Sequence, residues 1–248
     1  MTEQPPACLS HSTGGRVAFF GGSFDPPHLG HLAVARAARD ALRLDRVLFV
    51  PVGAQPLKPH GSTAPFADRV AMTSLAIAGE PGFEISLADA PAPDNQPNYT
   101  LKTLHVLRAG LPPDGSLFCL MGADSFVSLR RWRGAAEIPF VASLIVASRP
   151  GQQLDDLARF LPRELTLEPC ILAADASPPS VQIELRSYLV RNPAGQTAPF
   201  YLLPDLDVEI SASDIRKQVP SAAQNPIAAR SPLPASVADY IRTRALYR

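Results

Sequence analysis

Two histidines, His28 and His31, stand three residues apart, just after the glycine pair Gly21-Gly22. The apolar run 17–20 before them is typical of a buried strand, and the alanine-rich run 32–42 after them is typical of an amphipathic helix. A glycine turn between a strand and a helix start suits phosphate, because backbone N–H groups and the helix dipole point at the ligand. Histidines at i and i+3 share a helix face and can bond one group. The spacing therefore predicts nucleotide chemistry.

Prolines restrict the loop between these glycines and histidines. Pro26 and Pro27 make the site partly preformed, and Gly30 leaves room between the imidazoles. Taken alone, a His-x-x-His pair is more often a helix cap or a surface pair. As a zinc pair it lacks a third ligand nearby, because Asp25 is expected to be held in the turn by its neighbours. We therefore expect a phosphate site and no metal held by protein ligands.

A second group of anion ligands falls within residues 210–216. Ser213 is a predicted N-cap, Asp214 falls in the first helical turn, and Arg216 lies one turn in. A capped helix start with an arginine makes another oxyanion site. Alone, this segment would be interpreted as an ordinary capped helix, so its significance depends on the first segment.

Composition excludes several classes of protein. Lysine plus arginine number 23, as do aspartate plus glutamate, and a neutral chain without a long basic run offers no broad surface to nucleic acid. Cys8, Cys119 and Cys170 are too widely spaced for a disulfide framework or a structural zinc site, which fits a reducing cytosol. No apolar run approaches the roughly 18 residues that span a bilayer, and the start lacks a signal-peptide pattern. We expect a cytoplasmic protein with no nucleic-acid or membrane partner.

Strand-like and helix-like runs alternate along the first 150 residues, which predicts βαβ units. The predicted fold class is α/β, a Rossmann-like parallel sheet with helices on both faces and a small C-terminal helical portion. A flexible leader, 1–15, is expected before one nucleotide-binding domain, 16–248. The predicted strands are 17–20, 47–52, 83–87, 117–121 and 143–147, and the predicted helices are 31–42, 66–78, 98–109 and 124–130.

The pattern is harder to interpret from residue 151 to residue 204. The runs 154–161 and 181–190 could be helices, and Asn192-Pro193-Ala194-Gly195 breaks the pattern. A further helix is expected within 210–219 and a final one over 235–246.

Both chemical segments match motifs of a known superfamily. The first resembles the GxFDPxHxGH signature of the nucleotidyltransferase α/β-phosphodiesterase superfamily, from Gly22 to His31. The second resembles its ISSTxIR motif, with Ala212 in place of a serine and Ser213 in place of a threonine, which keeps the hydroxyl. The resemblance implies a single nucleotidyltransferase domain in which Ser213 and Arg216 clamp the β- and γ-phosphates of a nucleotide.

Further segments over nearly the whole chain resemble the bacterial nicotinate-nucleotide adenylyltransferases. They are Val50-Pro51 with Pro56-x-Lys58, Asp68-Arg69-x-x-Met72, Asn98-Tyr99-Thr100-x-x-Thr103-Leu104, Gly122-x-Asp124-Ser125 with Trp132, Ser148-Arg149-Pro150-Gly151, and Leu233-Pro234 through Tyr240-Ile241 to Leu246-Tyr247-Arg248. The segment 175–199 is longer and richer in proline than is usual in that family, and it is interpreted as a variable, loop-rich segment.

The resemblance implies an enzyme of NAD biosynthesis that transfers the adenylyl group of ATP to nicotinate mononucleotide. The products are deamido-NAD and pyrophosphate, formed by in-line attack without a covalent intermediate. No general base is expected, because the attacking phosphate has a second pKa of about 6 and is already ionised. Mg²⁺ is expected to bind with the ATP. The two nucleotides are the expected partners, and the sequence is compatible with a homo-oligomer.

The resemblance also implies three groups of site residues. The expected catalytic residues are His28, His31 and Arg216. The expected ATP-binding residues are Gly21, Gly22, Ser23, Phe24, Gly30, Gly122, Asp124, Ile210, Ser211 and Ser213. The expected nicotinate mononucleotide-binding residues are Lys58, Tyr99, Thr100 and Trp132, with the indole of Trp132 stacked on the pyridine ring.

Several alternatives stay open from the sequence. Trp132 could be a core residue, although the arginines around it favour an exposed loop. Arg133 stands where the family often has tyrosine, and it could add a charge near the nicotinate carboxylate or point to solvent. Lys58 could be a solvated lysine, and Asp124 could cap a helix. A cytidylyltransferase or a pantetheine-phosphate adenylyltransferase shares the first motif, and outside the enzymes the alternative is a regulatory nucleotide-binding module.

Overall fold

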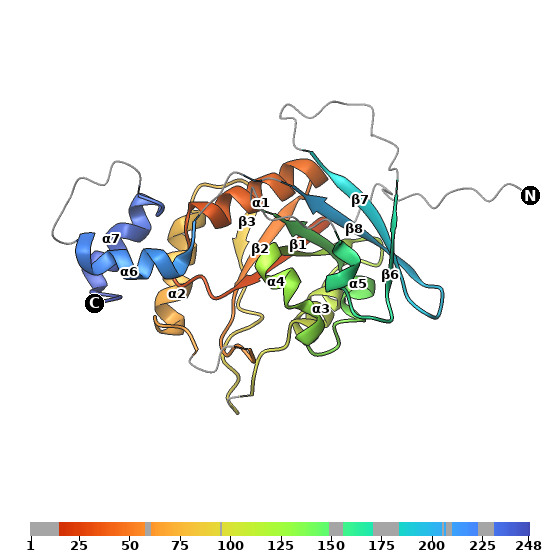
Figure 1. Cartoon of the computed structure of the whole chain (residues 1–248). Helices are drawn as coiled ribbons and strands as arrows, with labels where there is room; N and C mark the ends of the chain where they lie inside the picture. The colour runs from red at the N-terminus through yellow and green to blue at the C-terminus, as the bar shows by residue number, and fades with distance from the viewer. Residues whose placement is uncertain are drawn as a thin grey trace, which may run out of the picture.

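A central sheet organises the protein (Figure 1). The computed structural model describes residues 15–57, 61–94, 96–148, 156–170, 184–204, 206, 210–222 and 231–248. In this part of the chain the sheet has eight strands, in the order β3 (Phe83–Ile85), β2 (Arg46–Pro51), β1 (Arg16–Gly22), β4 (Ser116–Gly122), β5 (Ser143–Ala147), β8 (Thr197–Leu203), β7 (Arg186–Arg191) and β6 (Thr166–Pro169). The strands from β3 to β8 in this order are parallel, whereas β7 and β6 add to the edge in antiparallel pairing.

Helices cover both faces of the sheet, as the sequence predicts. On one face lie α1 (Leu29–Leu42) and the end of α2 (Phe66–Ile77). The other face is covered by α3 (Thr100–Ala109), α4 (Ala123–Val127), the 3₁₀ helix η1 (Leu129–Arg131) and α5 (Ile138–Val141).

This double covering explains the continuous apolar strands. In β1, Val17 and Phe19 point into the core that contains α3, α4 and α5, and Ala18 and Phe20 point into the core that contains α1. Since side chains alternate along a strand, a strand buried on both faces must be apolar at every position. The runs 17–20, 47–52, 117–121 and 143–147 therefore form the buried centre of the sheet, whereas 83–85 forms the edge strand β3, in which Glu84 is exposed.

The order of strands places a crevice at β1. From β1 the chain continues to β2 on one side, and later returns to β4 on the other. In such sheets ligands bind beyond the carboxyl ends of the strands, where the order reverses. Gly21-Gly22 and Gly122 lie at the carboxyl ends of β1 and β4, so both face this crevice.

Two C-terminal helices, α6 (Ala212–Ala222) and α7 (Ala235–Arg244), lie beside α2 (Figure 1). A separate apolar cluster joins these three helices through Met72 of α2, Ile215 of α6, and Val237 and Ile241 of α7. The cluster fixes α6 in place, which matters because α6 carries Arg216.

The structure corrects two predictions in the region 151–204. The described part of the run 181–190 is not a helix, because 186–191 forms β7. A turn at 192–196 joins β7 to β8, where the backbone N–H of Gln196 donates to Oδ1 of Asn192 (3.0 Å). Tyr188 packs edge-on against Phe200 across the strands, so the cross-strand ladder and its aromatic pair prevail over helical periodicity.

The described part of the run 154–161 forms only the short 3₁₀ helix η2 (Leu157–Phe160), because the backbone becomes extended at Leu161 and a turn then leads to β6. Residues 1–14 of the expected leader and residues 175–183 of the variable segment lie outside the described residues. In the part of the chain that the structure describes, no helix has the length and apolar character needed to cross a membrane.

Candidate active site

The loop after β1 delivers the two predicted histidines to the start of α1. His28 is the N-cap residue of α1 and is buried, and its imidazole stacks on that of His31 with ring centroids 3.7 Å apart. The backbone N–H of His28 donates to Nδ1 of His31 (3.2 Å). Because Nδ1 accepts this bond, a neutral His31 carries its proton on Nε2. Nε2 is thus the donor that this ring can offer to a phosphate oxygen.

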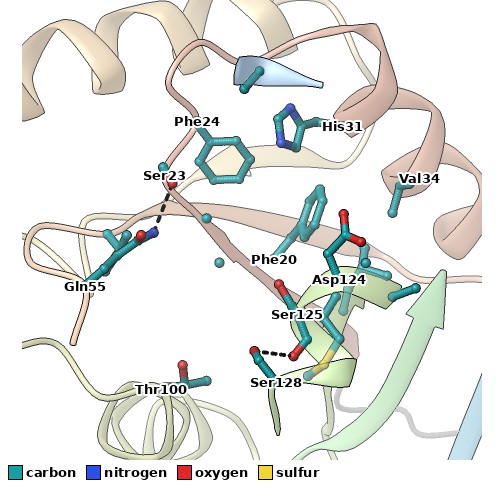
Figure 2. Close-up of a pocket in the computed structure, with 18 of the residues that line it drawn as sticks. Phe20, Ser23, Phe24, His31, Val34, Gln55, Thr100, Asp124, Ser125 and Ser128 are labelled. Carbon is teal, nitrogen blue, oxygen red and sulfur yellow. Dashed lines mark hydrogen bonds between the residues drawn. The ribbon is translucent and has the colours of Figure 1, made fainter. Parts of the chain in front are cut away.

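An aromatic cluster supports the loop from below. Phe20 packs against Phe24 and Phe49, with ring centroids 5.7 and 5.3 Å away, and Figure 2 shows Phe24 beside His31. Gly21 is constrained by packing against the preceding strand residues, because a Cβ there would lie 2.3 Å from Cζ of Phe19, which belongs to the core on the other face of the sheet. The glycine therefore has a packing role in addition to keeping the backbone accessible.

Asp25 is buried, and its carboxylate accepts hydrogen bonds from other parts of the protein. Oδ2 accepts from the backbone N–H of Thr63 (2.6 Å), and Oδ1 accepts from that of Ala64 (3.0 Å) and from the hydroxyl of Tyr247 (2.8 Å). Asp25 is held in place as predicted, but by residues that are remote in the sequence and not by its neighbours in the turn. Its carboxylate oxygens therefore serve to position the loop.

Arg216 connects the second segment to the first. Its Nη1 donates to the peptide oxygen of Asp25 (2.7 Å), and its Nη2 donates to Oγ of Ser213 (3.2 Å). The prediction that Ser213 caps the helix is wrong. Helix α6 begins at Ala212, and the peptide oxygen of Ser211 accepts the first helical hydrogen bond, from Ile215 (3.0 Å). Ser211 therefore holds the capping position, and the Ser213 hydroxyl accepts from Arg216 instead.

Arg69 of α2 holds the base of the loop, a role that the sequence analysis missed. It is 2% exposed, and its guanidinium donates to the peptide oxygens of Ser23 (2.6 Å), Val52 (2.8 Å) and Ala64 (3.2 Å). Burial lowers the pKa of this guanidinium, while the carboxylate of Asp25 opposes that shift. Three separate stretches of backbone thus meet on one side chain. Arg69 lies on the buried face of α2 with Asp68, Met72 and Thr73.

The opposite wall of the site is aromatic. Tyr99 is the N-cap residue of α3, Thr100 is its first residue, and Trp132 follows η1. Nε1 of Trp132 donates to Oγ of Ser128 (3.2 Å), which in turn donates to the peptide oxygen of Ser125 (2.8 Å; Figure 2). Trp132 is half-buried: it packs against the core and also lines the pocket. The sequence left open whether Trp132 is a core residue or a pocket residue, and the structure shows that it is partly both.

A pocket of about 640 Å³ lies between the histidine loop and the aromatic wall. Figure 2 shows one part of it, with Phe24 and His31 on one side and Thr100 and Ser128 on the other. The predicted residues that line it are His28, His31, Arg216, Gly21, Gly22, Ser23, Phe24, Gly30, Gly122, Asp124, Ile210, Ser211, Ser213, Tyr99, Thr100 and Trp132. Lys58 lies outside the described residues. The geometry suits a ligand that carries phosphates at one end and a flat ring at the other.

Two further pocket residues were not found from the sequence. Nε2 of Gln55 donates to Oγ of Ser23 (3.0 Å; Figure 2), and its buried Oε1 has no hydrogen-bond partner among the described residues. Asp89 is buried and accepts from the hydroxyl of Thr103, and burial raises the pKa of its carboxyl. Neither residue belongs to a motif with a mechanism, so no sequence pattern pointed to them.

The donor set of the pocket fits a metal carried by the nucleotide. Within the described ranges, no group of three His, Cys, Asp or Glu side chains is placed to hold a metal ion. Mg²⁺ in nucleotide sites keeps several waters and binds chiefly through substrate phosphates. With Asp25 occupied, Asp124 is the carboxylate at the start of α4 that can approach such an ion or its waters.

Comparisons with known proteins show the family to which the chain belongs. A family model described as cytidylyltransferase-like matches residues 19–218. A probable nicotinate-nucleotide adenylyltransferase of Roseiflexus castenholzii is 38% identical over 239 residues, which cover 95% of this chain and 100% of that protein. A protein of the same name from Gloeobacter violaceus is 35% identical over 234 residues, which cover 94% of this chain and 97% of that protein.

A solved structure shares the fold. Plasmodium falciparum nicotinic acid mononucleotide adenylyltransferase, complexed with NaAD, aligns with a TM-score of 0.65 at 16% identity and covers 94% of this chain and 97% of its own. At that identity the likeness concerns the fold, while the curated relatives establish the family. The chain is therefore an enzyme of the nicotinate-nucleotide adenylyltransferase family, within the cytidylyltransferase-like nucleotidyltransferases.

Proposed function

We propose that this enzyme transfers the adenylyl group of ATP to nicotinate mononucleotide and forms deamido-NAD and pyrophosphate. The observation that carries the proposal is the shared pocket, which the two segments predicted to bind phosphate line together with an aromatic wall. The names of the curated relatives support the choice of acceptor.

The proposed step is a direct phosphoryl substitution. An oxygen of the acceptor's 5′-phosphate forms a bond to the α-phosphorus of ATP, and the bond from that phosphorus to the bridging oxygen of the β-phosphate breaks. The electron pair leaves with pyrophosphate. Because the acceptor phosphate is already ionised near neutral pH, no side chain has to remove a proton. Catalysis then depends on positioning and on stabilising charge at the phosphates.

The histidines and Arg216 are assigned to that charge. His31 offers Nε2 to the oxygens of the α- and β-phosphates, and His28 stacks against it in the same loop. Arg216, held between Asp25 and Ser213, faces the leaving pyrophosphate. When Mg²⁺ is bound with ATP, it neutralises phosphate charge.

The remaining predicted residues fall into two groups by position. The ATP-binding group lies at the ends of β1 and β4 and at the starts of α1, α4 and α6. It comprises Gly21, Gly22, Ser23, Phe24, Gly30, Gly122, Asp124, Ile210, Ser211 and Ser213. The acceptor group comprises Tyr99, Thr100 and Trp132, with Lys58 proposed from its motif alone. A flat aromatic side chain such as Trp132 suits the electron-poor pyridine ring.

An acceptor panel tests the proposal. The enzyme is incubated with ATP, Mg²⁺ and one acceptor at a time: nicotinate mononucleotide, nicotinamide mononucleotide or 4′-phosphopantetheine, with CTP and phosphocholine as a separate arm. Mass spectrometry should detect deamido-NAD as the preferred product, together with pyrophosphate. Preference for a pantetheine or choline product would reassign the enzyme within its superfamily, and nucleotide binding without any product would favour a regulatory module.

A further inference from the structure

The residue after Trp132 carries a positive charge into the aromatic end of the pocket. Arg133 lines the pocket, and its guanidinium carbon lies 4.9 Å from the centroid of the Tyr99 ring. This is a cation–π arrangement, which holds a guanidinium against an aromatic face even near solvent. Arg133 therefore does not extend freely away from the protein. It forms one wall of the ring-binding end together with Tyr99 and Trp132.

The surroundings leave this charge available to a ligand. Among the residues that the structure describes, no carboxylate forms an ion pair with Arg133. Glu137 has its carboxylate beside Gly134 and forms no ion pair with Arg133. Of the carboxylates that line the pocket, Asp89 is bonded to Thr103, and Asp25 is bonded within the phosphate loop. The contact with the face of Tyr99 acts through the charge of the guanidinium, so its N–H donors stay available to a ligand.

We propose that Arg133 is a specificity-determining residue that favours an acceptor whose ring carries a carboxylate over one whose ring carries a carboxamide. This inference rests on the proposed function, because it concerns the acceptor of the same reaction. The acceptor's phosphate must reach the histidine loop, so its ring lies at the opposite end, beside Trp132 and Arg133. There a carboxylate gains a charge-assisted hydrogen bond, whereas a neutral carboxamide gains only an ordinary one.

Substitution of Arg133 tests the inference by a ratio of rates. Wild type, Arg133→Gln and Arg133→Lys are compared for kcat/KM with nicotinate mononucleotide and with nicotinamide mononucleotide. We expect Arg133→Gln to lower kcat/KM for the acid about 10-fold or more, because the charge-assisted hydrogen bond to its carboxylate is lost. The value of kcat/KM for the amide should change little. Arg133→Lys should recover part of the preference. The preference in wild type should also weaken as ionic strength rises, because the guanidinium is near solvent.

Arg130 provides the matched control. It carries the same charge three residues away, but its Nε donates to the peptide oxygen of Leu161 (2.5 Å), outside the pocket. Arg130→Gln should leave the ratio unchanged. An acid-to-amide ratio that survives Arg133→Gln would overturn the inference, as would an equal change in Arg130→Gln.

Binding measurements separate this inference from the proposed function. Calorimetric titration of both mononucleotides into wild type and Arg133→Gln, with a non-hydrolysable ATP analogue present, reports the preference without turnover. If the wild type forms no dinucleotide but binds the acid in preference to the amide, and Arg133→Gln lacks that binding preference, only the proposed reaction is refuted. Normal turnover with an unchanged ratio would refute the role of Arg133 alone. Absence of binding of either mononucleotide would refute both.

Discussion

At the scale of single residues, the site depends on donors whose orientation is set before any ligand arrives. The backbone N–H of His28 fixes the ring of His31, and Ser128 fixes the ring of Trp132. In both cases a hydrogen bond to one ring nitrogen, Nδ1 of His31 or Nε1 of Trp132, fixes the orientation of the ring in the pocket. Preorganised donors of this kind need little rearrangement when charge develops at a phosphate.

Replacement of His31 by alanine should therefore impair chemistry more than folding. The variant loses the Nε2 donor and the partner of the His28 backbone N–H, and we expect kcat to fall by about 10²–10⁴-fold. Steady-state assays of pyrophosphate release would measure the loss, and circular dichroism would confirm that the fold is retained. Turnover close to that of wild type would remove His31 from the mechanism.

Trp132 should affect the acceptor more than ATP. We expect Trp132→Ala to raise KM for nicotinate mononucleotide more than KM for ATP, because stacking on the ring is lost. Trp132→Phe keeps an aromatic face but loses the bond to Ser128, and it should be intermediate. Initial rates with one substrate varied at a time would measure both constants. Equal changes in both would contradict a stacking role.

At the scale of elements, helices outside the pocket hold the loops that line it. Arg69 of α2 joins the loops after β1 and β2, and the apolar cluster of α2, α6 and α7 keeps Arg216 in reach of Asp25. The pocket therefore depends on contacts that no ligand touches. A substitution in these helices should alter the site through backbone position.

Arg69→Met should destabilise the protein and weaken nucleotide binding together. The methionine fills much of the volume but leaves two buried peptide oxygens and one part-buried peptide oxygen without this donor, which costs about 3 kcal/mol or more. Urea denaturation would measure the loss in the free energy of unfolding, and kinetics at low temperature should show a raised KM for ATP. Arg36→Met is the control, because that exposed arginine pairs with Glu80 at the surface. Equal effects of the two substitutions would argue against a positioning role for Arg69.

The elements also show what the sequence could and could not predict. The buried parallel strands and the strand–turn–helix junction at 21–31 were predictable, because a strand covered on both faces must be apolar throughout. Strand β7 was missed, although a turn rich in Asn, Pro and Gly precedes β8, because its periodicity suits a helix as well. Ser213 was misplaced by two residues, since either serine could cap. Arg69 could not be assigned, because its partners are peptide oxygens that no pattern of side chains reveals.

At the scale of the whole molecule, Tyr247 links the C-terminal region to the phosphate loop. Its hydroxyl donates to Asp25, and burial together with the Asp25 carboxylate raises the pKa of the phenol above its ordinary value. A folded-state pKa above the unfolded value means that the folded protein holds this proton more tightly. The stability it contributes is therefore present below pH about 10 and is lost as the pH rises further.

Tyr247→Phe should accordingly change how the free energy of unfolding depends on pH in the alkaline range. At neutral pH we expect a loss of about 1 kcal/mol, from one buried hydrogen bond. Above pH about 10, wild type should lose stability by up to about 1.4 kcal/mol per pH unit more than the variant. Chemical denaturation at a series of pH values would measure both free energies of unfolding, and parallel curves would show that the phenol does not titrate with folding.

The bonds of Asp25 to Arg216 and to Tyr247 join residues 191 and 222 positions apart in the chain. Closing loops of that length is slow, since the entropy of the intervening chain is lost before the contact forms. A refolding population should consequently regain its sheet before its ability to bind nucleotide. During that interval ATP cannot stabilise the protein by binding, because its site has not yet formed. Only the folded sheet would then protect newly made enzyme from proteolysis and aggregation.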